Sequence, residues 1–275
     1  MYKKNQESGI RNQGLNKILK EIVEKKKKDL VKQKKEIPPI KLKEFASNLA
    51  SGGSKFKEKL LNSGEIALIA EIKLASPADS SFKPTIEIID QAQKYEKAGA
   101  DAISYITETH FFKGDVSKVV TISAKVKIPI LQKDFVIDEY QIYEAKIVGS
   151  TALLLIARLV DSKTLKEFIQ LCRGLSIEPV VEINNEEDLL KAKTVNPSII
   201  AVNARDLGTF EVDIDKACKL IKKIPNKYIK LAFSGVKSPT EVRKYKEAGA
   251  RGVLVGTSLM TAKDIKSFIL SLRGA

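Results

Sequence analysis

Two patterns of hydrophobic and polar positions divide the chain near residue 62. In the first part, apolar residues recur every three or four positions, which is the spacing of a helix with one buried face. This spacing runs through residues 15–31 and returns in residues 42–49 and 56–61, and Pro38-Pro39 breaks the pattern between the first two segments. Lysines occupy the other face of the first segment. We therefore expect amphipathic helices that pack on the rest of the protein.

The second part alternates short apolar runs with longer amphipathic segments. Strands that are buried on both faces of a parallel sheet have nearly continuous apolar sequences. The amphipathic segments between them are long enough to form right-handed crossover helices. Eight such strand–helix units predict the α/β class and, within it, a closed (β/α)8 TIM barrel with an N-terminal helical extension. The expected strands are Ile66–Ile72, Ala102–Ile106, Ile128–Leu131, Ala152–Ile156, Pro179–Ile183, Ile199–Val202, Ile229–Phe233 and Gly252–Val255.

Glycines before three of these strands support the barrel. Gly99, Gly149 and Gly249 each follow a helical segment and precede the second, fourth and eighth strand, where a glycine can end the helix and turn the chain. An open doubly wound sheet is the alternative fold. It needs a glycine-rich phosphate loop after the first strand, and residues 71–77 do not provide one.

Positive charge is concentrated in the predicted extension. Residues 1–60 contain 17 lysines and arginines against 7 acidic residues, so they carry ten of the 14 net positive charges of the chain. Most are lysines with few aromatic residues among them, whereas nucleic-acid recognition relies on arginine and on aromatic stacking. We interpret the charge as a solvated helix face and expect no nucleic-acid partner. The extension should comprise residues 1–62 and cap the barrel, which leaves residues 63–275 as the catalytic domain.

Composition argues against several other classes of protein. The chain has no apolar run of membrane-spanning length, no apolar segment behind its polar first residues, and no metal-binding, Rossmann or Walker motif. Cys172 and Cys218 lie in helical patterns and should be small buried residues rather than a disulfide or a zinc site. The single histidine, His110, should be a loop residue rather than a catalyst. We expect a cytoplasmic monomer that binds no membrane, metal or cofactor.

Charged and amide side chains interrupt the apolar runs at their C-terminal ends, where (β/α)8 barrels have their active sites. Alternate strand residues share a face, so the glutamate and lysine that end the first strand should point the same way. Charges are costly in an apolar interior unless they are paired or used. A set drawn from four strands therefore predicts a catalytic centre whose acid and base work near neutral pH. The set comprises Glu71, Lys73, Lys133, Glu182, Asn203 and Arg205.

The last two strands lead into turns that contain glycine. Ser234-Gly235 follows the seventh strand, and Gly256-Thr257 follows the eighth. In (β/α)8 barrels these two loops commonly bind phosphate, because glycine lets backbone N–H groups approach the anion closely. The pattern therefore predicts a small phosphorylated substrate.

Several segments resemble the indole-3-glycerol-phosphate synthase family. Residues 71–77 resemble its E-I-K-x-x-S-P signature, residues 111–114 its F-F-x-G segment, and residues 133–145 its K-D-F…Q-I-x-E-A stretch. Further matching segments surround Glu182 and Asn203. The resemblance runs from residue 15 to the end of the chain, and the order of the motifs makes it specific.

The resemblance implies conversion of 1-(2-carboxyphenylamino)-1-deoxyribulose 5-phosphate to indole-3-glycerol phosphate in tryptophan biosynthesis, with loss of carbon dioxide and water and without a cofactor. It implies Lys133 as the general acid of ring closure, and Lys73 as an anion-binding residue and candidate second acid. Glu71 and Glu182 would orient these lysines and supply the base. The substrate would lie against Asn203, Arg205 and Ser76, and its phosphate against Gly235, Gly256 and Thr257, beside Ser234. The N-terminal helices would cap the barrel mouth and shield the anthranilate ring.

Three positions depart from the family pattern. Phe233 stands where the family usually has a glutamate before Ser-Gly, residues 78–84 lack the family's lysine-glycine pair, and Thr261 stands where an arginine often follows Leu-Met. Two hypotheses remain. The chain is a working synthase, or it is a divergent phosphate-binding barrel paralogue with weak or lost activity. A third, a polyanion-binding protein that uses the basic N-terminus, leaves the polar set at the strand ends unexplained.

Overall fold

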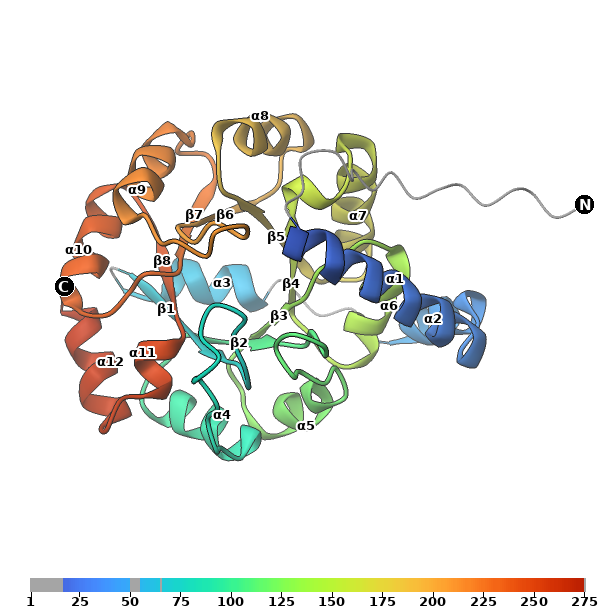
Figure 1. Ribbon diagram of the computed structural model, residues 1–275, viewed down its shortest axis with the longest axis horizontal. Coiled ribbons are helices and arrows are strands. Elements are labelled where there is room, and N and C mark those ends of the chain that lie inside the picture. Colours follow the sequence, from blue (N-terminus) through green and yellow to red (C-terminus); the bar gives the residue numbers. More distant parts are fainter. Residues whose placement is uncertain (1–16, 50–54, 65, 275) are drawn as a thin grey trace, which may run out of the picture.

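The computed structural model describes residues 17–49, 55–64 and 66–274 (Figure 1). The expectations for Leu15 and for the polar first residues lie outside these ranges. Within them, eight parallel strands form a closed ring, each paired with the next along the chain and β8 paired with β1. The barrel prediction is confirmed and the open doubly wound sheet was wrong. The strands are β1 (Ala67–Ile72), β2 (Ala102–Ile106), β3 (Ile130–Lys133), β4 (Ala152–Ile156), β5 (Glu178–Ile183), β6 (Ile199–Asn203), β7 (Ile229–Phe233) and β8 (Gly252–Val255).

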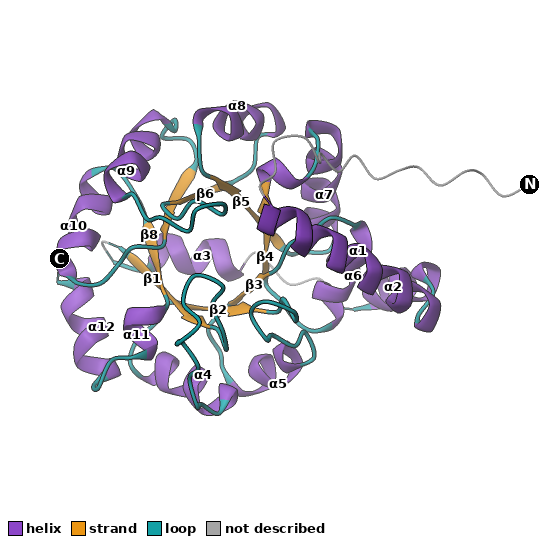
Figure 2. Cartoon of the chain, viewed as in Figure 1, coloured by secondary structure: helices purple, strands orange, loops and turns teal. Residues whose placement is uncertain are grey.

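Helices that follow the strands surround the ring (Figure 2). The predicted glycine turns are present, because Gly99, Gly149 and Gly249 all have a positive φ, of 96°, 89° and 98°. Side chains would be strained in this backbone conformation, and glycine is not. The helices are α1 (Lys17–Glu36), α2 (Pro39–Asn48), α3 (Lys55–Asn62), α4 (Ile88–Lys97), α5 (Lys118–Lys125), α6 (Glu139–Ile147), η1 (Ala157–Leu159), α7 (Ser162–Gly174), α8 (Glu186–Val195), α9 (Ile214–Lys223), α10 (Pro239–Glu247), α11 (Thr257–Met260) and α12 (Ile265–Arg273).

The third strand begins and ends two residues later than the hydrophobic pattern indicates. It was expected to end at Leu131, because the next two residues are polar, but it continues through Gln132 to Lys133. Gln132 is buried, and its side-chain oxygen accepts a 2.6 Å hydrogen bond from Ser150 Oγ. A paired amide can occupy a barrel interior that an unpaired one would destabilise. The strand therefore delivers Lys133 directly to the C-terminal rim of the barrel.

The second helix also begins earlier than the periodicity indicates. It was expected from Leu42, but it starts at Pro39, and the first helix continues to Glu36. Proline suits the first turn of a helix, because the N–H that it lacks would have no partner there. The pair Pro38-Pro39 therefore ends one helix and begins the next.

The N-terminal helices lie at different ends of the barrel. Lys26 of α1 forms an ion pair with Asp134 at the C-terminal end of β3, so α1 lies beside the barrel mouth. By contrast, Arg251, which precedes β8, donates hydrogen bonds to the carbonyl oxygens of Leu61 and Gly64. Helix α3 therefore covers the opposite end of the barrel, where Figure 1 shows it behind the ring of strands. The expectation that all the N-terminal helices cap the mouth was wrong for α3.

The cysteines differ from one another in burial. Cys172 is fully buried as expected, whereas Cys218 is only half-buried on α9. Neither forms a disulfide. None of the helices in the described ranges is long and apolar enough to cross a lipid bilayer.

Helix α6 presents an acidic side chain to the interface with α1. Burial, together with the nearby charge of Asp134 and against the opposing charge of Lys26, raises the pKa of Glu144 to about 7. A carboxyl group whose pKa is raised by folding stabilises the protein while it is protonated, and this contribution is lost as the pH rises through the folded-state pKa. Stability should therefore fall between the ordinary pKa of glutamate and neutral pH.

Replacing Glu144 by glutamine should remove this dependence. Glu144→Gln should resemble the wild type in free energy of unfolding near pH 5 and exceed it by about 2 kcal/mol near pH 8. Urea unfolding at several pH values measures the difference. Glu139→Gln, an exposed position on the same helix, is the matched control and should not change the pH dependence. A constant difference between Glu144→Gln and the wild type across this pH range would contradict the prediction.

Candidate active site

All eleven residues expected in the site line two adjoining cavities at the C-terminal ends of the strands. The first cavity, of about 90 Å³, is bordered by the acid–base residues and by an apolar wall. The second, of about 460 Å³, is bordered by the turns after β7 and β8. Glu71, Lys73, Arg205 and Ser234 line both. The expected residues of the first cavity are Glu71, Lys73, Ser76, Lys133, Glu182, Asn203, Arg205 and Ser234, and the second adds Gly235, Gly256 and Thr257.

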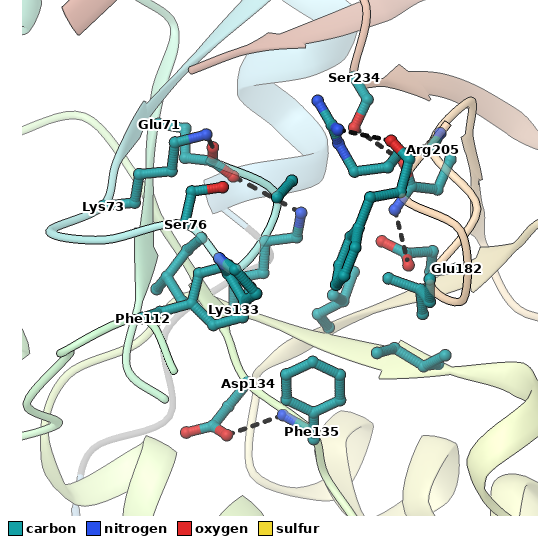
Figure 3. A pocket seen from close by; sticks show the side chains of 18 residues that line it. Glu71, Lys73, Ser76, Phe112, Lys133, Asp134, Phe135, Glu182, Arg205 and Ser234 are labelled. Carbon is teal, nitrogen blue, oxygen red and sulfur yellow. Dashed lines mark hydrogen bonds and ion pairs between the residues drawn. The ribbon is translucent and has the colours of Figure 1, made fainter. Parts of the chain in front are cut away.

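Glu71 lies between the two lysines. Its Oε2 atom is 3.6 Å from Lys73 Nζ, and its Oε1 atom is 3.5 Å from Lys133 Nζ. Figure 3 shows these side chains converging from β1 and β3 on one side of the cavity. Burial tends to raise the pKa of Glu71, but Lys133 and Lys73 together hold it below its usual range. Glu71 is therefore an anion that orients two cations.

Lys73 has a lowered pKa. Burial lowers its pKa, Glu71 acts in the opposite direction, and the neighbouring charges of Lys133 and Arg205 lower the pKa further. Its ammonium group also donates a 2.8 Å hydrogen bond to Thr257 Oγ1. Lys73 therefore connects the acid–base residues with the turn after β8.

Glu182 lies across the cavity in a different environment. Its Oε1 atom accepts a 3.1 Å hydrogen bond from Asn203 Nδ2, while its Oε2 atom is buried without a hydrogen-bond partner among the described residues. Burial raises the pKa of Glu182 despite the opposing charge of Lys133 and the Asn203 hydrogen bond. A carboxylate with a free oxygen and a raised pKa is suited to accept a proton from a bound molecule.

Asn203 joins Glu182 to the residues that follow β6 and β7. Its side-chain oxygen accepts hydrogen bonds from Ser234 Oγ, at 2.9 Å, and from the backbone N–H of Arg205, at 3.0 Å. The guanidinium group of Arg205 donates to the carbonyl oxygen of Phe210 at 2.8 Å. This network fixes one side of the cavity and places a permanent cation over it.

The two glycines serve different local purposes. A Cβ atom on Gly256 would lie 2.3 Å from Glu71 Oε2, so the absence of a side chain makes room for that carboxylate. Gly235 has a φ of 85°, and a Cβ there would also press on Ile214. The sequence indicated phosphate binding at both positions, but the seating of Glu71 is an additional role that only the structure reveals.

Aromatic side chains form the apolar wall, and the sequence reasoning did not select them. The rings of Phe112 and Phe135 lie 6.4 Å apart between centroids and border the first cavity together with Phe210. Phe112 belongs to the F-F-x-G segment and Phe135 to the K-D-F segment. These two motifs could therefore have indicated the aromatic wall. Their rings could cover a flat aromatic ligand.

Phe233 and His110 have contacts that explain their places. The Phe233 ring is buried, and Lys133 Nζ lies 5.3 Å from its centroid, within range of a cation–π interaction. The position where a glutamate was expected therefore still faces Lys133. His110 Nε2 lies 2.6 Å from Asp29 Oδ2 of α1, in the loop after β2, and does not line either cavity. No cluster of three or more potential metal-binding His, Cys, Asp or Glu residues occurs in the described ranges.

Comparison with known proteins identifies related sequences. A family model described as indole-3-glycerol phosphate synthase matches residues 19–272. The indole-3-glycerol phosphate synthase of Caldanaerobacter subterraneus subsp. tengcongensis is 40% identical over 259 residues, which cover 94% of this chain and 99% of that protein. The protein of the same name from Aliarcobacter butzleri is 39% identical over 251 residues, covering 90% and 95%.

Solved structures with low sequence identity share the fold. 3-Hexulose-6-phosphate synthase superposes with a TM-score of 0.60 at 16% identity, over 76% of this chain and 99% of that one. Thiamine phosphate pyrophosphorylase from Pyrococcus furiosus gives a TM-score of 0.55 at 14% identity, over 76% and 95%. At these identities the likeness concerns the barrel alone.

Substitution of Gly256 should disturb Glu71 without unfolding the barrel. In Gly256→Ala, the added methyl group should displace the Glu71 carboxylate, so that its distances to Lys73 and Lys133 exceed the ion-pair range. A crystal structure of the variant measures these distances. Gly174→Ala is the control, because a Cβ at Gly174 meets no neighbouring atom within 4 Å. If Glu71 keeps both lysine contacts in Gly256→Ala, the proposed role of Gly256 is wrong.

Proposed function

Because the chain belongs to the indole-3-glycerol phosphate synthase family, we propose that the eleven residues at its barrel mouth carry out the reaction of that family. The enzyme is a carboxy-lyase of tryptophan biosynthesis. It converts 1-(2-carboxyphenylamino)-1-deoxyribulose 5-phosphate to indole-3-glycerol phosphate, carbon dioxide and water. The observation that carries the assignment of roles is the placement of two lysines and two glutamates around one cavity, where Glu71 contacts both lysines and, in the described part of the chain, Glu182 keeps one oxygen unpaired.

Substrate binding divides between the two cavities. The phosphate group lies in the second cavity against Gly235, Gly256 and Thr257, and Lys73 and Arg205 supply positive charge from its border. The anthranilate ring lies in the first cavity against the aromatic wall, with its carboxylate towards Ser76. This orientation places the ribulose carbonyl between Lys133 and Glu182.

Ring closure needs an acid. The ring carbon that bears the carboxylate attacks the ribulose carbonyl carbon, and the carbonyl oxygen gains a proton from Lys133 as the new carbon–carbon bond forms. Glu71 holds the Lys133 ammonium group in place throughout this step, because its own pKa keeps it ionised. Loss of carbon dioxide then restores the aromaticity of the ring.

Dehydration needs a base and a second acid. Glu182 accepts a proton from the methylene carbon beside the ring nitrogen, which becomes a ring carbon of the indole, and Lys73 protonates the departing hydroxyl group, which leaves as water. The free Oε2 atom and raised pKa of Glu182 favour it over Glu71 as the base. The lowered pKa of Lys73 makes it a stronger acid than an ordinary lysine. The atoms balance, because one carbon dioxide and one water leave the substrate.

The remaining expectations form part of the same proposal. Residues 1–62 act as an extension of a catalytic barrel formed by residues 63–275, and the enzyme works as a cytoplasmic monomer on a small-molecule substrate, without a nucleic-acid partner. The paralogue hypothesis rests on Phe233. Its ring contacts Lys133, which supports a continued role at the site, and the similarity over nearly the full chain favours the working synthase.

Loss of the Lys133 ammonium group should remove most of the activity. Lys133→Met should lower kcat by about 10²-fold or more, because general acid catalysis of ring closure is lost. The fluorescence of the indole product measures the rate. Lys125→Met, at an exposed position on α5, is the matched control and should retain full activity. An unchanged rate in Lys133→Met would remove this residue from the acid role, and wild-type protein without any turnover would favour the paralogue.

The base should be visible in the pH dependence. Only ionised Glu182 can accept a proton, and folding raises its pKa, so kcat should decline on the acid side at a pH above the ordinary range of a glutamate. Glu182→Gln should lower kcat by about 10²-fold, and its residual rate should lack this decline. Exposed Glu186 on α8 provides the control, since Glu186→Gln should keep the wild-type profile. A decline that persists in Glu182→Gln would assign the base to another group.

A further inference from the structure

Helix α1 contacts the loops that carry the aromatic wall of the first cavity. In Figure 1 it starts at the rim of the ring beside β4 and β5 and runs outward across α6. Its side chain Lys26 is buried, with 8% of its surface exposed, and Lys26 Nζ lies 2.8 Å from Asp134 Oδ1. A buried lysine reaching 108 positions along the chain to the residue next to Lys133 connects the extension with the acid–base residues.

Asp134 also accepts hydrogen bonds from residues that follow β3 and β2. Its Oδ1 atom also accepts a 2.7 Å hydrogen bond from the backbone N–H of Phe135, which Figure 3 shows below the cavity. Its Oδ2 atom accepts a 2.7 Å hydrogen bond from Thr107 Oγ1 at the end of β2. Lys26 therefore holds the residue that lies between Lys133 and Phe135.

A second set of contacts holds the loop after β2. The carboxylate of Glu108 accepts hydrogen bonds from the backbone N–H groups of His110, Phe111 and Phe112, at 2.7 to 3.0 Å. Helix α1 also contacts this loop, because Asp29 lies within hydrogen-bonding distance of His110. Lys25 Nζ also lies 4.6 Å from the centre of the Phe111 ring. Phe112 and Phe135 of the aromatic wall are thus both connected to α1, Phe112 through the loop after β2 and Phe135 through Asp134.

Stability alone does not account for the buried ion pair. Removing two charges from water opposes their attraction, and a well-packed apolar pair is often as stable. Burial tends to lower the pKa of Lys26, but the charge of Asp134 and its hydrogen bond hold that pKa above its usual value. Lys26 therefore stays charged. Its charge fixes the orientation of the Asp134 carboxylate.

We propose that Lys26 is a positioning residue that determines affinity for the aromatic ring of the substrate, by holding Asp134 and through it Phe135. The inference rests on the proposed function, because it assumes that an anthranilate or indole ring lies between Phe112 and Phe135. Lys26 itself does not line the two cavities of the site. Figure 1 shows β7 and β8 on the opposite side of the ring from α1, so we expect the phosphate contacts to be independent of Lys26.

Two ligands distinguish a specific effect of Lys26 on the aromatic wall from a general destabilisation of the site. Calorimetry on the full-length protein measures the affinity for indole-3-glycerol phosphate, which has a ring and a phosphate, and for glycerol 3-phosphate, which lacks the ring. In Lys26→Met, affinity for the indole ligand should fall about tenfold, the scale of a misplaced supporting shell, while affinity for glycerol 3-phosphate stays within about twofold. Lys28→Met, which makes the same change at an exposed position on α1, should leave both affinities unchanged.

The outcomes distinguish the inference from the proposed function. Equal weakening of both ligands, or no change in either, would overturn the role of Lys26. If Lys26→Met does not fold, Lys26→Met/Asp134→Asn also removes the Asp134 charge that would lose its partner, and it should show the same selective loss of indole affinity. Turnover of the wild type, measured separately, tests the proposed chemistry, whereas the ratio of the two affinities in the variants tests Lys26.

Discussion

One buried carboxylate organises the site. Glu71 is shared by Lys73 and Lys133, which arrive from different strands and would repel each other without it. Two cations around one anion leave a net positive charge in a partly apolar cavity, where a phosphorylated and carboxylated substrate supplies the missing negative charge. Gly256 has no side chain, and the Glu71 carboxylate occupies the space that a Cβ atom there would need. The proposed acid strength of the two lysines and the proposed attraction of the substrate both depend on this one arrangement.

The barrel explains why residues so far apart in sequence can share an ion pair. Parallel pairing in chain order brings all eight strand ends to one rim, and closure through β1 and β8 places the acid–base residues next to the glycine turns. Opposite environments then separate the two glutamates. Glu71 faces two cations and stays ionised, while Glu182 faces an amide and a free volume and holds its proton more tightly. One fold thus shifts the pKa of the same residue type in opposite directions, which is the difference that the proposed orienting anion and the proposed base require.

Sequence reasoning predicted the strands and all eleven lining residues, because period and strand-end chemistry are local signals. It misplaced the limits of β3, because the buried Gln132 is satisfied by Ser150, a partner that no local pattern reveals. It assigned α3 to the wrong end of the barrel, since an amphipathic pattern states that a face is buried but not where. It also gave no indication of the Lys26–Asp134 pair, because nothing in the sequence of a lysine-rich helix shows which lysine lies near a distant carboxylate in the fold.

The order of elements along the chain has a consequence during synthesis. Helix α1 is synthesised before the eight strands of the barrel, yet Lys26 meets its partner Asp134 only after β3 has been made. Until then an apolar stripe on a strongly basic helix is exposed, and such surfaces invite premature association. The lysines on the opposite face of the helix oppose such association, because like charges repel each other.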